Sequence, residues 1–109
     1  MASTWTPHGR YVVAAGSSSA SVTLTQEISD GRHVRTVSLT AVGADVRYNW
    51  GSAATASSFY LKNGETVYMD VPWFMISDGS DAVLHAIRAG NTDGTIEIIS
   101  WGSIWHLGD

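Results

Sequence analysis

The sequence predicts an all-β protein, an antiparallel β-sandwich or jelly-roll-like barrel of about eight short strands. Apolar and polar residues alternate with a period of two along most of the chain, and helical periodicity is hard to find. Turns that contain glycine separate the alternating segments at regular spacing, which is typical of sandwiches and barrels. The chain has 109 residues, the length of a single small domain.

The beginning of the chain predicts an arm that stands apart from the sandwich. A short apolar run, YVVAA at residues 11–15, is followed by GSSSAS at residues 16–21, the only low-complexity piece of the sequence. We therefore expect residues 1–19 to form an N-terminal arm with a flexible Gly/Ser linker, and residues 20–109 to form the β-sandwich domain. Such an arm can order on binding and wrap a neighbouring subunit.

The next two alternating segments predict a pair of strands. Residues 22–28 alternate apolar side chains with Thr and Glu, and Asp30-Gly31 is a strong hairpin signal. The strand that follows, at residues 33–41, is rich in Thr and Val, which fit a half-buried pleated surface. Its apolar face carries Val37, Leu39 and Ala41.

Residues 45–50 predict a strand with two different faces, and Gly43 permits a bend or bulge just before it. One face carries Val46, Tyr48 and Trp50. The other face carries Arg47, which needs no ligand, because an arginine on a solvated sheet face can pair across strands with a carboxylate. The segment is therefore interpreted first as ordinary half-buried sheet and only second as a ligand platform.

The middle of the chain predicts a loop, a short strand, a tight turn and another strand. Residues 52–58 are small and polar, as in a loop. Asn63-Gly64 is the preferred pair for a type I′ turn, whose twist matches that of flanking strands. The strand after this turn ends at Val71, because Pro72 cannot donate to a ladder.

The last third of the chain predicts two further strands. Residues 73–76 are apolar on both faces, so they are either central in the fold or covered by another chain. AVLHAIRA, at residues 82–89, contains good helix formers. It is short, alternates in character and lies between glycine-containing turns, so we expect a strand. TIEIISW, at residues 95–101, is the last clear strand.

Composition argues against several functional classes. Six Lys and Arg stand against ten Asp and Glu, a net charge of −4, and the scattered basic residues disfavour nucleic-acid binding. The absence of cysteine removes disulfides, thiolate catalysis and Cys-zinc sites. The N-terminus does not have the pattern of a signal peptide, and no apolar run approaches the ~20 residues that cross a bilayer. We expect a protein made soluble in a cytoplasm, with no membrane partner.

No catalytic, cofactor or metal site is expected from the residue pattern. Asp78 and Asp81 fall in a turn, where Asp is common for its local hydrogen bonding, and there is no GxSxG motif. The four histidines lack the HxH or HxxxH spacing of a preformed metal site. A cupin-like enzyme ranks last, because its metal could be held only by His33, His85, Asp70 and Glu65.

The aromatic residues leave two alternatives open. Five tryptophans with only 15% charged residues indicate that part of the surface meets protein, since aromatic side chains dominate small β cores and interfaces. The interface candidates are Trp5, Tyr11, Trp73, Phe74, Trp101, Ile104 and Trp105. The other possibility is a sugar-stacking platform, which normally also needs polar groups nearby. Its candidates are Trp50, Trp73 and Trp101.

A succession of short motifs runs through residues 33–99. Asp45-Val46-Arg47-Tyr48 forms a V-R-aromatic strand, which a Ser/Ala/Thr loop and the leucine and glycine turn of residues 61–64 follow. Paired strands come next, in Ala86-Ile87-Arg88-Ala89-Gly90 with Gly94-Thr95-Ile96. This succession resembles a recurrent type of small tailed-phage virion protein.

The resemblance implies a non-enzymatic virion component, either a capsid decoration (cement) protein or a small head or tail accessory protein. It implies partners such as the major capsid protein or other virion subunits, a homo-oligomer (trimer or dimer), and a location in the virion. Its mechanism is burial of apolar surface, amplified by avidity over many copies. The alternative function is a carbohydrate-binding β-sandwich module or a phage tail adhesin.

Overall fold

A computed structural model of the chain describes residues 4–24, 27–28, 32–72 and 81–104. The described residues form nine β-strands and no helix, which confirms the predicted all-β class. The strands are β1 (Thr4–Ala15), β2 (Ala20–Leu24), β3 (Glu27–Ile28), β4 (Arg32–Val42), β5 (Val46–Trp50), β6 (Phe59–Leu61), β7 (Thr66–Asp70), β8 (Ala82–Arg88) and β9 (Gly94–Ile104).

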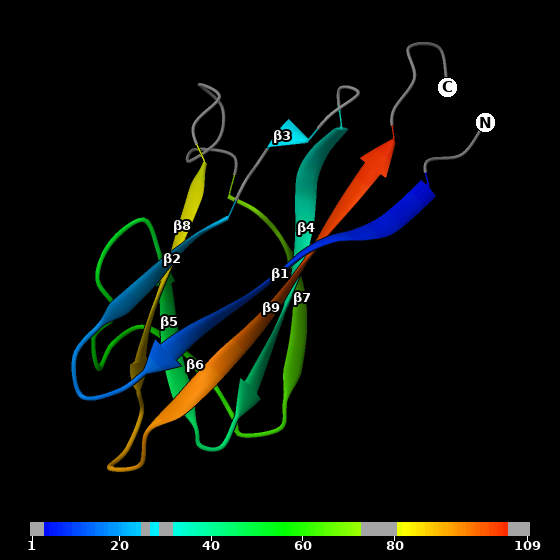
Figure 1. Cartoon of the computed structure of the whole chain (residues 1–109). Coiled ribbons are helices and arrows are strands. Elements are labelled where there is room, and N and C mark those ends of the chain that lie inside the picture. Colours follow the sequence, from blue (N-terminus) through cyan, green and yellow to red (C-terminus); the bar gives the residue numbers. More distant parts are fainter. Residues whose placement is uncertain (1–3, 25–26, 29–31, 73–80, 105–109) are drawn as a thin grey trace.

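The strands form two antiparallel sheets that face each other (Figure 1). Sheet A has the order β1-β9-β4, with β7 and the two-residue β3 also paired to β4. Sheet B has the order β2-β8-β5-β6. Apart from β3, the strands pair in a nested order. The outermost pair in the sequence is β1 with β9, followed by β2 with β8, β4 with β7 and β5 with β6. This nested pairing is the strand order of a jelly roll, so the predicted sandwich is confirmed.

The core lies between the sheets, and the alternation of side chains decides which residues enter it. Along β5, Val46, Tyr48 and Trp50 are buried, while Arg47 and Asn49 are partly exposed, as the sequence pattern predicts. Each fully buried aliphatic side chain stabilises the fold by about 1.5–3 kcal/mol. The largest of them are Leu24, Leu39, Leu61, Leu84, Ile96, Ile98, Val37 and Val46.

The segment that competes between helix and strand is a strand. Residues 82–88 form β8, which pairs with β2 on one side and β5 on the other. Ala82, Leu84 and Ala86 are buried, and the residues between them are only partly buried. The period of two therefore outweighs the helix propensity of Ala and Leu, because pairing and burial on both sides override a weak intrinsic preference.

The N-terminal segment forms part of the sandwich, where the sequence led us to expect an arm. Within residues 1–19, Thr4–Ala15 forms β1 and pairs with β9 along its whole length. Val13 and Ala15 are buried, and Tyr11 packs against the core. The Ser-rich residues 17–19 therefore lie in the connection from β1 to β2 and do not separate an arm from a domain.

A bulge in β1 depends on one glycine. The register between β1 and β9 shifts between Pro7 and Gly9. A Cβ atom at Gly9 would lie 2.9 Å from both the Ser100 hydroxyl oxygen and a ring carbon of Tyr11. Only glycine fits here without displacing these two side chains.

The Asn63-Gly64 turn is present, but it does not close a hairpin. The Glu65 N–H donates to the Lys62 carbonyl at 2.9 Å, and Gly64 has a φ of 84°. The strands on either side, β6 and β7, belong to different sheets. The turn is held instead against the link between β4 and β5, because the Gly43 N–H donates to Asn63 Oδ1 at 3.1 Å.

Candidate functional site

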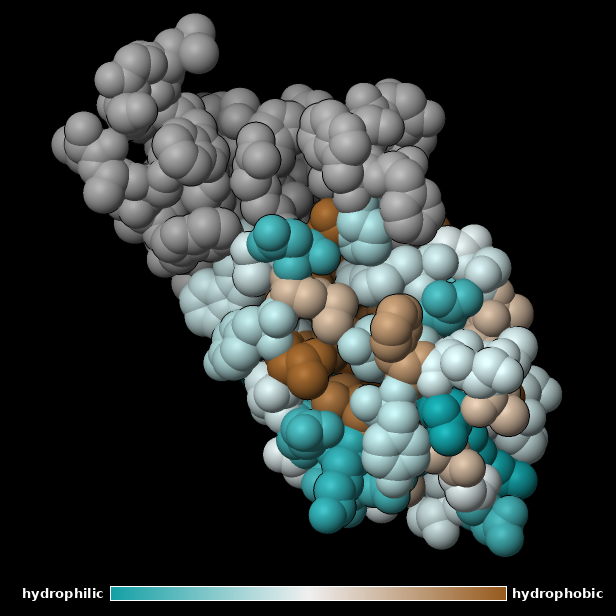
Figure 2. Space-filling model, turned by 180° about the vertical axis from the view of Figure 1, so that it is seen from behind, coloured by the Kyte–Doolittle hydropathy of each residue, from teal (hydrophilic) through white to brown (hydrophobic). Residues whose placement is uncertain are grey.

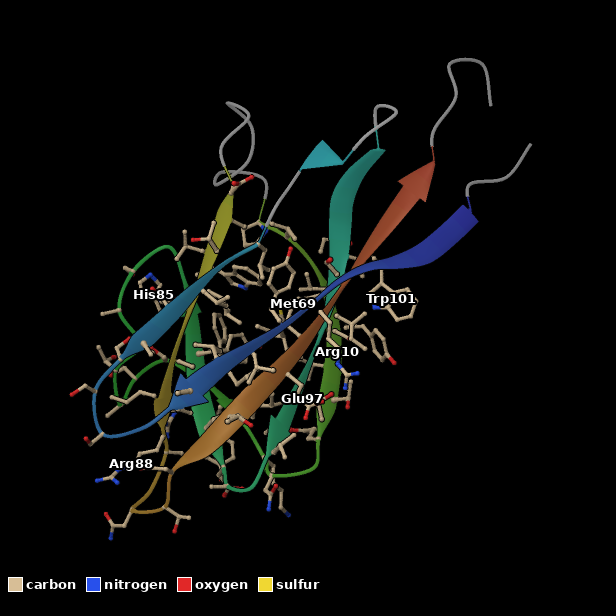
Figure 3. The ribbon with its side chains drawn as sticks, in the orientation of Figure 1. Arg10, Met69, His85, Arg88, Glu97 and Trp101 are labelled. Carbon is tan, nitrogen blue, oxygen red and sulfur yellow. The ribbon has the colours of Figure 1, made fainter. Side chains whose placement is uncertain are left out.

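The outer face of sheet A consists of the side chains of β1, β9, β4 and β7 that point away from the core. Three of its apolar side chains are well exposed: Val12 at 59%, Val42 at 40% and Tyr68 at 70%. Ile99 and Trp101 lie on the same face and are partly buried. Figure 3 shows Trp101 on this side of the molecule, together with Arg10 and Glu97. The exposed apolar side chains lie on three different strands of this face, and the row that runs from Val12 to β7 passes through Glu97, Thr40 and Thr66.

The polar groups of the outer face bond to one another across neighbouring strands. Thr36 Oγ1 donates to Asp70 Oδ1 at 3.2 Å, and Thr40 and Thr66 share a hydroxyl–hydroxyl bond of 2.7 Å. Arg10 and Glu97 form an exposed ion pair at 3.3 Å, which adds little stability. Because these groups have partners within the sheet, covering the face with protein leaves few of them unsatisfied.

The side of the sandwich between β6 and β7 is open, and we call it the open edge. Phe59, Val67 and Met69 are directed toward the inter-sheet space, yet Phe59 is 62% exposed and the other two are only partly buried. Figure 3 shows Met69 between the two sheets. Figure 2 views the molecule from behind, away from β1 and β2, and shows hydrophobic side chains at the middle of that surface.

A hollow of about 350 Å³ lies at the open edge. Its wall includes an aromatic pair, in which the rings of Tyr48 and Phe59 stack at 5.4 Å between centroids. Burial, followed by the negative charge of Glu65, raises the pKa of Tyr48, so its hydroxyl stays protonated at neutral pH. The lining residues are Tyr48, Asn49, Trp50, Phe59, Met69, Asp70 and Pro72.

On the outer face of sheet B, Arg47 is held by contacts within the protein. Its guanidinium lies 5.2 Å from the centre of the Tyr60 ring, and its Nη1 donates to the Ser58 carbonyl at 2.8 Å. The Tyr60 hydroxyl donates to the Asp45 carboxylate. Arg47 therefore has a structural role beside β6, because its guanidinium already contacts groups of the protein itself.

The Asp45 carboxylate organises this end of the molecule. Besides Tyr60, the Asn63 N–H donates to it at 2.8 Å. The bond from Asn63, then the bond from Tyr60 and the charge of Lys62, lower the pKa of Asp45. The hydrogen bond between the Tyr60 hydroxyl and the Asp45 carboxylate raises the pKa of Tyr60. These bonds tie the loop after β4 to the turn after β6.

A second hollow, of about 280 Å³, is formed by loops at the same end. Its lining includes Asp45, Asn63 and Asn91. Across the described parts of the chain, no three His, Cys, Asp or Glu side chains gather closely enough to hold a metal ion. Of the residues considered for a cupin-like site, Asp70 bonds to Thr36 on the outer face of sheet A. His85 lies on β8 in sheet B, as Figure 3 shows.

The structure separates the predicted aromatic candidates. Trp50 is 8% exposed and faces inward, so it contributes to the hollow but offers no open stacking platform. Tyr11 packs against the core from β1. Trp101 lies on the outer face of sheet A, and its indole N–H is buried with no hydrogen-bond partner in the described structure. These three candidates therefore do not form one cluster.

The remaining candidates belong to the chain ends or to undescribed residues. Trp5 pairs with Ser103 and Ile104 pairs with Thr4 where β1 meets β9, so their backbones lie in sheet A. Trp73, Phe74 and Trp105 lie outside the described residues.

Sequence reasoning missed the exposed residues Phe59, Tyr60 and Tyr68. A usable signal was present, because adjacent aromatics in a strand point to opposite faces, so Phe59 and Tyr60 cannot both enter the core. Likewise, the alternation in TVYMD places Tyr68 opposite to Val67 and Met69. Which face is covered depends on the sheet to which each strand belongs, and local pattern does not specify that.

Compared with known proteins, the chain matches no family model, no curated protein and no solved structure. Within the described residues there is no helix with the length and apolar character needed to span a membrane.

Proposed function

We propose that this protein is a non-enzymatic structural protein of a tailed-phage virion, a capsid decoration (cement) protein that stabilises the shell through multivalent protein contacts. Its partners are the major capsid protein or other virion subunits and further copies of itself. The surface that meets the shell is the outer face of sheet A.

The observation that carries the proposal is the exposure of Val12, Val42 and Tyr68 on one sheet face, the outer face of sheet A. Large apolar side chains that stay exposed on one face of a folded domain are typical of protein contact sites. The cross-strand bonds among the threonines of this face support the same reading, since they reduce the cost of excluding water. A jelly roll is also a frequent architecture of virion proteins, although fold alone does not specify function.

The test is co-sedimentation of the purified protein with empty shells assembled from the major capsid protein encoded with it. We expect saturable binding at a fixed number of copies per shell. Val12→Lys places a charge on the outer face of sheet A and should weaken binding by about tenfold or more, as expected for a contact residue worth over ~1.4 kcal/mol.

Thr23→Lys is the matched control. Thr23 is exposed on β2, on the opposite sheet, and the substitution adds the same charge to another edge strand. It should leave shell binding unchanged. The proposed function is contradicted if the wild-type protein does not sediment with the shells, and the docking face is contradicted if Thr23→Lys weakens binding as much as Val12→Lys.

A carbohydrate-binding role is the second candidate, and the hollow at the open edge favours it. Its lining includes the aromatic residues Tyr48, Trp50 and Phe59 and the polar residues Asn49 and Asp70, and sugar sites combine residues of these two kinds. Glycans that enter the hollow should change tryptophan emission, because Trp50 lines it. Phe59→Ala should abolish that change, and an unchanged emission across a glycan panel would exclude this role.

A further inference from the structure

β7 is an edge strand of sheet A in the part of the chain that the structure describes. In the described structure β7 pairs only with β4. Just before β7, the Ala41 N–H donates to the Glu65 carbonyl at 3.1 Å. Bonded pairs recur at every second residue of an antiparallel ladder, so Val67 and Met69 bond to β4. The N–H and C=O groups of the alternate residues, Thr66, Tyr68 and Asp70, therefore point to the free edge.

The sequence of β7 is complementary to itself when two copies run antiparallel. TVYMD reads polar, apolar, aromatic, apolar, polar in both directions. With Tyr68 opposite Tyr68 of the second copy, Thr66 faces Asp70 and Val67 faces Met69. No like charges oppose each other, and the backbone groups that point outward from the two strands meet as bonded pairs.

The inner side of this pairing is apolar as well. Val67 and Met69 are directed toward the inter-sheet space and are only partly buried. Met69 lines the hollow beside Phe59. A second copy would place its own Met69 and Val67 against them, on the side where the sandwich is open. An exposed strand edge with an apolar inner face is otherwise a liability that proteins cover.

We propose that the open edge is closed by a second copy of this chain, through two-fold antiparallel pairing of β7 with β7. Such an interface is isologous. It makes sheet A continuous across the dimer and turns both outer faces to the same side. The inference rests on the proposed function for its biological role, because a doubled flat face binds one shell with avidity. The pairing itself is tested without any shell.

The test is light scattering of the purified wild-type protein and of two variants over a concentration series. Wild type should be a dimer, with twice the 11.7 kDa mass of the chain. Tyr68→Lys puts two lysines opposite each other on the two-fold axis and should raise the dimer dissociation constant at least tenfold. Val12→Lys changes an exposed residue of β1, the other edge of sheet A, and should remain dimeric.

The register is tested by opposite charges at one exposed position. Thr66→Lys faces Asp70 of the second copy and should tighten the dimer, whereas Thr66→Asp should loosen it. Two symmetric pairs change in each variant, so the expected effect is roughly two- to thirtyfold in the dissociation constant. A variant that merely damaged the fold would not give effects of opposite sign.

Several results would overturn the proposal. In light scattering, these are a monomer at every concentration, a trimer, or a dimer that Val12→Lys dissociates but Tyr68→Lys does not. In the register test, the contradicting result is an equal change of the dimer dissociation constant in Thr66→Lys and Thr66→Asp. Failure of the dimer leaves the shell-binding test intact, and a dimer that does not sediment with shells removes the virion role while keeping the interface.

Discussion

At the scale of single residues, the structure distinguishes positions that look alike in the sequence. Arg47 and Tyr60 seem suited to a ligand, yet they bond to each other, to Ser58 and to Asp45. The alternation in the sequence predicts that Arg47 faces outward, which the structure confirms. It cannot predict the partner, because Asp45 and Tyr60 meet only after β5 and β6 pair.

Gly94 and Gly90 should respond differently to substitution by alanine. A Cβ at Gly94 would lie 3.0 Å from the Val42 carbonyl oxygen and 3.1 Å from the Ala44 nitrogen, both backbone atoms that cannot move away alone. Gly94→Ala should therefore lower the free energy of unfolding by about 1–3 kcal/mol. At Gly90 nothing lies within 4 Å, so Gly90→Ala should stay within about 0.5 kcal/mol of wild type. Urea titrations measure both, and equal effects would contradict the account.

The pH dependence of stability should carry a signature of Asp45. Its folded pKa is below its ordinary value of 3.8, chiefly because the Asn63 N–H and the Tyr60 hydroxyl bond to the carboxylate. A lowered folded pKa stabilises the protein above the unfolded pKa, and this stabilisation disappears as the pH falls through the folded pKa. Asp45→Asn should therefore be less stable than wild type at pH 7, and the gap should narrow below pH 3.8. A gap that is constant from pH 7 to pH 2 would contradict this role.

At the scale of strands, faces follow from the sequence more readily than partners. The period of two correctly predicts the buried faces of β4 and β5, and that β8 is a strand, because it depends only on the geometry of an extended chain. The Asn63-Gly64 turn is also predicted, but the strands around it enter different sheets. The Asn63-Gly64 pair determines that the chain reverses between β6 and β7. The sheet that each of these strands joins depends on its partner, which is β5 for β6 and β4 for β7.

β1 is a second case in which the sequence does not reveal the partner of a strand. Its separation by a Ser-rich stretch suggests an arm, yet it is an edge strand of sheet A with Val13 and Ala15 in the core. Deleting residues 1–15 removes the partner of β9 along its whole length. The truncated chain should lose cooperative unfolding in urea. A truncated chain that still unfolds cooperatively with near wild-type stability would restore the arm hypothesis.

At the scale of the whole molecule, topology and exposed surface together shape the functional account. The sandwich is closed on the side of β1 and β2, where the chain passes directly from one sheet to the other, and open between β6 and β7. The sequence is rich in aromatic residues, from which we expect that part of the surface contacts other proteins. The nested pairing of strands decides which of them reach the surface, and the described ones that do are Phe59, Tyr60 and Tyr68.

The most direct test of the account is an electron-microscopy reconstruction of shells saturated with the protein, at a resolution that separates the two sheets. We expect density in which the outer face of sheet A, with Val12 and Val42, lies against the shell, and in which copies are joined in two-fold pairs through β7. Density in which sheet B or the loops around Asp45 meet the shell would contradict it, as would shells that remain bare.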